Sequence, residues 1–267
     1  YRRVIEVPER MGAHGEVVRH LDEAATRAAL AEAHAAGLRA LAIVLMHGWR
    51  YTEHEMRVAA IARACAACNA LLVHYSTDYV FDGSANQPYR EDHATAPLGV
   101  YGESKLAGEQ AIRASGARHA ILRTAWVYAS HGKNFLLTML RLAGEREELR
   151  VVADQVGAPT PAAWIADATA ALLREGVPSS GTWHLTSQGA TSWHGFAEAI
   201  VDEAHRRGLI GHKPRVLAIP TSDYPTPARR PAYSVLDTSR LQRDFGIVPP
   251  EWRQGLQRTL DDMALAR

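Results

Sequence analysis

The chain has 267 residues, 47% of them hydrophobic, which is enough to bury one large α/β core or a core with a smaller lobe. Its 30 basic and 29 acidic residues give a formal charge of +1, so no global field attracts nucleic acid or an anionic membrane. The longest purely apolar run, Ala40–Met46, is far shorter than the roughly 18 residues of a membrane helix. Two cysteines form no disulfide framework and suit a reducing compartment. We therefore expect a cytoplasmic protein that binds neither nucleic acid nor membrane.

The N-terminal residues predict a hairpin followed by a helix. Gly12 and Gly15 mark the turn of the hairpin, and Asp22 is placed to cap a helix that runs to about Ala36. Together these residues read as one βαβ-like piece.

The middle of the chain alternates short β-branched runs with longer amphipathic stretches, which predicts βαβ units and a parallel sheet. We expect strands at Leu41–Met46, Leu71–Tyr75, His119–Arg123 and Leu149–Val152. Helices are expected at about Glu53–Cys68, Tyr101–Ser115, Asn134–Ala143 and Ala162–Arg174. In such folds the ligand lies at the carboxyl ends of the strands.

The character of the chain changes after residue 175. Short strands are expected at Thr182–Leu185 and Arg215–Ile219, with a helix opened by Thr191 or Ser192 and a proline-rich loop, "IPTSDYPTPARRP". This pattern predicts a smaller lobe packed on the sheet.

The stretch "VYGESKLAGE" places Tyr101 and Lys105 four residues apart on a predicted helix. At this spacing both side chains project from one helix face and can reach one ligand. A nearby ammonium group favours the phenolate, which makes the tyrosine a better acid or base for a carbonyl or an alcohol. The pair alone also fits a solvated helix face, so the assignment depends on its context.

That context is a set of hydroxyl and carboxyl side chains after a predicted strand. Ser76, Thr77 and Asp78 fall just past the carboxyl end of Leu71–Tyr75, where a hydroxyl can share a carbonyl oxygen with Tyr101. A polar turn is the alternative interpretation. We favour the functional one because the tyrosine and lysine occur in the same chain.

Six motifs in order carry a family resemblance: "HYSTDYVFDG", "PLGVYGESKLAGE", "ILRTAWVYASHGKNF", "DQVGAPT", "GTWHLTSQGATSWHGFA" and "IPTSDYPTPARRPAYSVLDTSRL". Together they resemble the dTDP-4-dehydrorhamnose reductases, which are extended short-chain dehydrogenases/reductases, over about residues 65–267. The resemblance implies a Rossmann-like α/β fold with a smaller C-terminal substrate-binding lobe. It also implies reduction of the C4 ketone of dTDP-4-dehydro-L-rhamnose to dTDP-L-rhamnose with NADPH or NADH. A homodimer is compatible with the sequence, although the sequence does not fix the oligomeric state.

The same resemblance assigns roles to individual residues. Tyr101 is implied as the proton donor, Lys105 as the group that holds the nicotinamide ribose and lowers the tyrosine's pKa, and Thr77 as the group that orients the ketone. The cofactor is implied to contact Tyr75, Tyr101 and Lys105, and the sugar nucleotide Thr77, Asp78 and Trp126. A core aromatic at a strand end is the alternative for Trp126. The Gly157/Pro159 turn would shape the substrate loop, and Arg229 and Arg230 would meet the diphosphate unless they are simply solvated.

A glycine-rich phosphate turn between the first strand and helix, which such a reductase needs, is missing from the sequence. The nearest stretch, "MGAHGEV", has Val18 where a third glycine would fall, and the predicted helix opens only at Asp22. We interpret it as a hairpin turn, so the N-terminal half of the Rossmann-like sheet is incomplete or replaced.

Residues 1–60 instead resemble an internal segment of the hydantoinase/5-oxoprolinase family, chiefly in "VPER", "LDEAA" and "LMHGWRYTEHE". No phosphate-binding motif of that family is present, so no activity is carried over. The chain therefore reads as a chimera with its junction in Met56–Ala70, arising either from a natural fusion or from a gene-model artefact. The expected domains are 1–60, the remainder of the cofactor domain at 61–175, and the substrate lobe at 176–267.

Two other patterns include residue types found in metal or redox sites, but neither pattern is complete enough to predict such a site. Cys65 and Cys68 have redox or zinc spacing but lack a second pair and lie late in a predicted helix. The histidines form no ligand cluster, so no metal site is predicted. Three functions are left to compare: an active reductase, a catalytically silent sugar-nucleotide-binding remnant, and a hydantoinase-type subunit that rests on the N-terminal segment alone.

Overall fold

The computed structural model describes residues 10–11, 17–19, 22–37, 40–43, 61–226 and 228–265. The chain forms two compact units that interleave along the sequence. Unit 1 comprises Tyr1–Ser76, Val100–Leu122 and Val177–Gly181, and unit 2 comprises Thr77–Gly99, Arg123–Gly176 and Thr182–Arg267. The domain boundaries expected at residues 60 and 175 stay a prediction.

The N-terminal elements agree with the predicted hairpin and helix. Strands β1 (Arg10–Met11) and β2 (Val17–Arg19) pair antiparallel, while the turn at Gly12 and Gly15 lies outside the described residues. Helix α1 (Glu23–Ala35) begins where expected, because the Ala25 amide donates to Asp22 Oδ1 at 2.8 Å. This bond satisfies one of the amides that every helix leaves open at its start.

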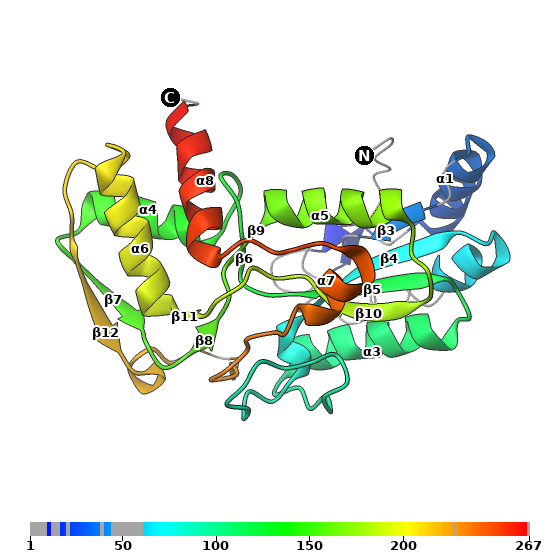
Figure 1. The fold of residues 1–267 in the computed structure, drawn as a ribbon, viewed down its shortest axis with the longest axis horizontal. Coiled ribbons are helices and arrows are strands. Elements are labelled where there is room, and N and C mark those ends of the chain that lie inside the picture. The colour runs from blue at the N-terminus through cyan, green and yellow to red at the C-terminus, as the bar shows by residue number, and fades with distance from the viewer. Residues whose placement is uncertain are drawn as a thin grey trace. The chain divides into compact units, whose positions relative to one another are not determined.

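The main sheet has the strand order β10-β5-β4-β3. Its strands are β3 (Ala40–Ile43), β4 (Leu71–Thr77), β5 (His119–Thr124) and β10 (Gly181–His184). β3 and β4 are parallel, with Ala40 opposite Leu71 (Figure 1). The predicted strand cores are confirmed, although Val44–Met46 lie outside the described residues and β4 runs two residues beyond Tyr75.

Helix α3 (Val100–Ala114) connects β4 to β5 and completes a βαβ unit. A helical segment at residues 61–67 precedes β4; the rest of the helix expected at Glu53–Cys68 falls largely outside the described residues. Apolar side chains from these elements form one buried cluster, composed of Ala62, Cys65, Leu72, Ile112, Ala117 and Ile121. The alternation of buried strands with amphipathic helices therefore follows the predicted pattern.

Unit 2 contains most of the remaining elements. Its helices are α4 (Phe135–Glu145), α5 (Ala162–Glu175), α6 (Trp193–Arg206), α7 (Ser239–Phe245) and α8 (Trp252–Leu265), with the 3-10 turns η1 (Asp78–Val80) and η2 (Thr221–Asp223). Its short strands are β6 (Val127–Tyr128), β7 (Glu148–Val152), β8 (Val156–Gly157), β9 (Thr160–Pro161), β11 (Thr191–Ser192) and β12 (Arg215–Ile219). Ser192 caps α6 by accepting from the Gly195 amide at 3.0 Å, which decides between the two predicted openings.

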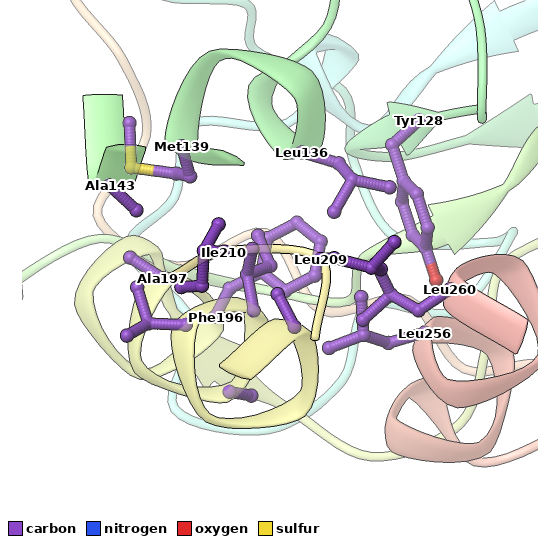
Figure 2. Close-up of a cluster of buried hydrophobic side chains, with 14 of the residues drawn as sticks. Tyr128, Leu136, Met139, Ala143, Phe196, Ala197, Leu209, Ile210, Leu256 and Leu260 are labelled. Carbon is purple, nitrogen blue, oxygen red and sulfur yellow. The ribbon is translucent and has the colours of Figure 1, made fainter. Parts of the chain in front are cut away.

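A large apolar cluster holds α4, α6 and α8 together. Figure 2 shows side chains of Tyr128, Leu136, Phe196, Leu256 and Leu260 converging between these helices. Phe196 is 1% exposed and lies within 6.0 Å, between ring centroids, of Tyr128, Phe135 and Trp252. The cluster gives unit 2 its own hydrophobic core.

One strand does not belong where the sequence pattern placed it. β7 was expected in the main parallel sheet, but it pairs in parallel with β12 in a separate two-stranded sheet, against which α6 packs (Figure 1). Along β7 only Leu149 and Val151 are buried, whereas β4 is buried almost throughout. A strand covered on one face alternates in this way, and a central parallel strand does not. The alternation in "ELRVV" carried this signal.

Candidate active site

Helix α3 of unit 1 carries the predicted acid–base pair. Tyr101 lies in its first turn and Lys105 one turn later, and both side chains are half-buried. Gly102, Ser104 and Gly108 are buried on the same helix. Because the helix is continuous over these positions, the i, i+4 spacing holds in three dimensions and the two side chains share one face.

The electrostatic surroundings of Lys105 include a buried histidine. His74 lies on β4 and is 2% exposed. Burial, with the Lys105 ammonium as the second cause, lowers the pKa of His74 from 6.5 to about 3, against the opposing effect of the Glu109 carboxylate. His74 is therefore neutral at pH 7 and adds no positive charge beside Lys105. Side chains alternate along a strand, so Tyr75 projects from the face opposite His74.

In unit 2, Thr77 and Asp78 form a direct hydrogen bond at the carboxyl end of β4. Thr77 Oγ1 lies 2.9 Å from Asp78 Oδ1 and accepts from the Tyr79 amide at 3.2 Å. Both residues are buried, and burial raises the pKa of Asp78 to about 7 although hydrogen bonds from Ser234 and Thr77 oppose the shift. The sequence placed Ser76, Thr77 and Asp78 just past the strand. Ser76 and Thr77 are instead its last two residues, whereas Asp78 follows it as predicted and opens η1.

Trp126 is held by an aromatic stack and a strained backbone. It follows β5 with φ of +47°, a left-handed conformation that a bulky side chain rarely adopts outside functional sites. Its indole stacks on Trp193, with centroids 3.5 Å apart and planes 2° apart, and Phe135 packs on Trp193 in turn. Gly157 lies so close that a Cβ there would stand 2.5 Å from Trp126 Cε2. Glycine at 157 is therefore required by the indole.

The segment at residues 232–237 forms backbone hydrogen bonds with two other parts of the chain, one containing Val156 and one containing Tyr89. The Val156 amide donates to Ala232 O, and the Ser234 amide donates back to Val156 O, each at 2.8 Å. On the other side the Tyr89 amide donates to Val235 O at 2.9 Å. The segment thus fixes the loop that contains Gly157 and brings Ser234 to the Asp78 carboxyl.

Other predicted residues have plainer surroundings. Arg229 and Arg230 are exposed, and their contact with a diphosphate stays a prediction. Cys65 is buried in the helix and Cys68 lies in the exposed turn beyond it. Burial, followed by the charge of Cys68, raises the pKa of Cys65 to about 11, so this thiol stays protonated at neutral pH.

Three side chains beside the predicted residues carried no predicted role: His74 in unit 1, and Trp193 and Ser234 in unit 2. Each of them lies within one of the six motifs quoted above, but the motif did not indicate what the side chain does. Their partners are distant along the chain or lie on another element, so the spacing of neighbouring residues cannot reveal these contacts. The structure thus joins Tyr101 to Lys105 in unit 1 and Thr77 to Asp78 in unit 2, while Trp126 is placed by Gly157 of the predicted turn and by Trp193, which had no predicted role.

Within the described residues no helix is both long and apolar enough to cross a membrane.

Comparison with known proteins assigns most of the chain to one family. A family model described as "RmlD substrate binding domain" matches residues 50–265. A second, described as "Hydantoinase/oxoprolinase N-terminal region", matches residues 1–66. The two matches overlap over residues 50–66, in the region of the inferred junction.

Among curated proteins, a dTDP-4-dehydrorhamnose reductase of Shigella flexneri is 49% identical over 209 residues, covering 77% of this chain and 70% of the relative. A protein of the same name from Burkholderia thailandensis is 51% identical over 217 residues, covering 77% and 72%. Among solved structures, the reductase of Bacillus anthracis in complex with NADP has a TM-score of 0.72 and 37% identity, covering 78% of this chain and 71% of that one. The ortholog from Clostridium acetobutylicum has a TM-score of 0.76 and 32% identity, covering 87% and 84%.

These similarities confirm the Rossmann-like α/β fold and the family resemblance. The chain belongs to the RmlD substrate binding domain family, together with relatives named dTDP-4-dehydrorhamnose reductase.

Proposed function

We propose that the chain reduces the C4 ketone of dTDP-4-dehydro-L-rhamnose to dTDP-L-rhamnose with NADPH or NADH. The observation that carries the proposal is the Tyr101/Lys105 pair on one face of α3, in a chain 49% identical to a protein named for this reaction. In the reaction a hydride adds to the carbonyl carbon and a proton to its oxygen, so the protein must supply a proton donor and hold the ketone.

The residues divide this work. Tyr101 donates its phenolic proton to the ketone oxygen, and the ammonium of Lys105 stabilises the phenolate that remains. Thr77 orients the ketone through its hydroxyl. Asp78 and Trp126 contact the sugar nucleotide, and the exposed guanidinium groups of Arg229 and Arg230 are suited to its diphosphate.

The residues present fit the nicotinamide end of the cofactor better than they fit its pyrophosphate. The half-buried Tyr101 and Lys105 side chains fit the nicotinamide ribose, and Tyr75 is proposed as a further contact. When bound, NAD(P)H supplies the hydride. For the pyrophosphate the sequence offers no glycine-rich turn, and residues 12–16 lie outside the described part of the chain. The choice between NADPH and NADH, the homodimer and the cytoplasmic location stay predictions.

The missing glycine-rich turn favours one second candidate. A remnant that binds dTDP-sugars without NADPH would keep the substrate side of the site, represented by Trp126 and its stack, and lose turnover. Binding of the reduced cofactor distinguishes the two functions, because the reductase binds NADPH and the remnant does not.

The test begins with NADPH titrated into the full chain, followed by tryptophan fluorescence, and continues with NADPH oxidation in the presence of the 4-keto sugar nucleotide. Saturable binding and turnover support the reductase. Tyr101→Phe should abolish turnover and retain dTDP binding, because it removes only the transferable proton. Tyr128→Phe is the matched control, since Tyr128 is buried in the helical cluster, and it should keep activity. A folded protein that takes up dTDP but not NADPH is the remnant, and an active Tyr101→Phe variant would show the proton donor to be wrong.

A further inference from the structure

The Thr77–Asp78 hydrogen bond raises the question of which residue supplies its proton. Thr77 Oγ1 lies 2.9 Å from Asp78 Oδ1 and already accepts from the Tyr79 amide. A hydroxyl has one proton to donate and two positions at which it can accept, whereas an ionised carboxylate and a ketone oxygen only accept. If Asp78 is ionised, the Thr77 proton is used on the carboxylate and none is left for a ketone.

The surroundings of Asp78 disfavour the ionised form. Its side chain is 2% exposed, and within the described residues its Oδ2 is buried without a hydrogen-bond partner. An ionised Oδ2 in this position loses its hydration, and the Ser234 hydroxyl, which favours the ionised form, only partly offsets the effect of burial. The upward shift in the pKa of Asp78 to about 7 has the same cause, burial.

We propose that Asp78 works as a neutral acid that donates its proton to Thr77, leaving the Thr77 hydroxyl to donate to the ketone oxygen of the sugar. Thr77 then accepts from Asp78 and from the Tyr79 amide and donates once, so each of its hydrogen-bonding positions is used. In this step Asp78 acts on the ketone through Thr77, in addition to its proposed contact with the sugar nucleotide. The inference rests on the proposed function, in which Thr77 orients the ketone.

Asp82 provides a matched control only four residues away. It accepts from the Ser84 amide at 3.1 Å, from Ser84 Oγ at 2.8 Å and from the Tyr89 hydroxyl at 2.8 Å. These bonds lower the pKa of Asp82 and keep it ionised. The two carboxyl groups therefore differ in protonation within one short segment.

Infrared difference spectroscopy at pH 6 tests the position of the proton without needing turnover. The spectrum of the wild-type chain minus that of Asp78→Asn should show the carbonyl stretch of a neutral carboxylic acid. The corresponding difference for Asp82→Asn should show a carboxylate band instead. A carboxylate band in the Asp78 difference would overturn the proposal.

Kinetics test the consequence for Thr77. Thr77→Val should lower kcat by about 100-fold, the usual effect of losing one donor to the developing oxyanion. Asp78→Leu should lower kcat by a similar factor, whereas Asp78→Asn should restore most of the kcat that Asp78→Leu loses, because its amide can donate to Thr77 without a charge. A loss in Asp78→Asn equal to that in Asp78→Leu would show that the charge is needed and would refute the proposal. Absence of turnover in the wild type would instead refute the proposed function, and the infrared result would still decide where the proton lies.

Discussion

Replacing Gly157 with alanine tests the arrangement around Trp126 most directly. The added methyl carbon would stand 2.5 Å from Trp126 Cε2, 2.6 Å from Nε1 and 2.8 Å from Cζ2. Carbon atoms in contact are normally about 3.5–4.0 Å apart, so the indole or the loop must move by about 1 Å. The indole is held by Trp193 at a centroid distance of 3.5 Å, and Trp193 is held by Phe135 at 4.7 Å. The displacement therefore disrupts a stack.

The expected magnitude follows from these contacts. Overpacking of this kind costs about 1–3 kcal/mol, which for a unit of this size lowers Tm by about 2–12 °C. Misplacing an aromatic contact to the sugar nucleotide also weakens the binding free energy of the sugar nucleotide by about 0.5–1.5 kcal/mol. This corresponds to a rise in KM of about 2- to 10-fold, with a smaller change in kcat.

Thermal unfolding followed by near-ultraviolet circular dichroism measures the first effect, and initial rates of NADPH oxidation measure the second. Where turnover is absent, calorimetric titration with dTDP replaces the rates. Gly144→Ala is the matched control, because Gly144 lies in α4 and a Cβ there meets nothing within 4 Å. It should raise stability slightly, as alanine generally does in a helix. If Gly157→Ala unfolds at the wild-type temperature and binds dTDP unchanged, the contact between Gly157 and the indole is not what positions Trp126.

Two predictions concern stability alone. Because the pKa of His74 is lowered from 6.5 to about 3, the folded state binds fewer protons than the unfolded state between these values, and stability is lost as the pH falls below 6.5. Urea unfolding at pH 7, 6 and 5 should give His74→Leu a shallower decline than wild type, by up to about 1.4 kcal/mol per pH unit, and parallel declines would contradict this. Phe196→Ala removes a ring that is 1% exposed in the helical cluster and should cost about 3–5 kcal/mol in the free energy of unfolding. A loss below about 1 kcal/mol would mean that the cluster collapses around the gap.

Local signals in the sequence predicted most of the elements. Strand β12 was expected at Arg215–Ile219 and occurs there, and Asp22 caps α1 as its residue type indicated. Such features depend on a few neighbouring residues, so periodicity and capping preferences report them. The i, i+4 relation of Tyr101 and Lys105 was predictable for the same reason.

The remaining features depend on contacts between segments that are far apart along the chain. The partner of Trp126 is Trp193, and the carboxyl of Asp78 is reached by Ser234. The burial of Asp78, which decides its protonation, is likewise a property of the packed unit. β7 was assigned to the wrong sheet because its β-branched composition was given more weight than its alternating exposure. Composition reports that a strand forms, and only packing decides which sheet it joins.

Strand β3 connects the two family matches within one sheet. Ala40–Ile43 lie in the segment that matches the hydantoinase/oxoprolinase family, yet their backbone pairs with β4, which lies in the reductase match. Backbone hydrogen bonds are nearly indifferent to side-chain identity, so a strand from outside the reductase-like part of the sequence can serve as a neighbour. An unpaired edge of a sheet is a template for association with other chains. A chain cut back to residue 61 would leave β4 with that open edge, so we expect the shortened chain to self-associate more readily than the full chain.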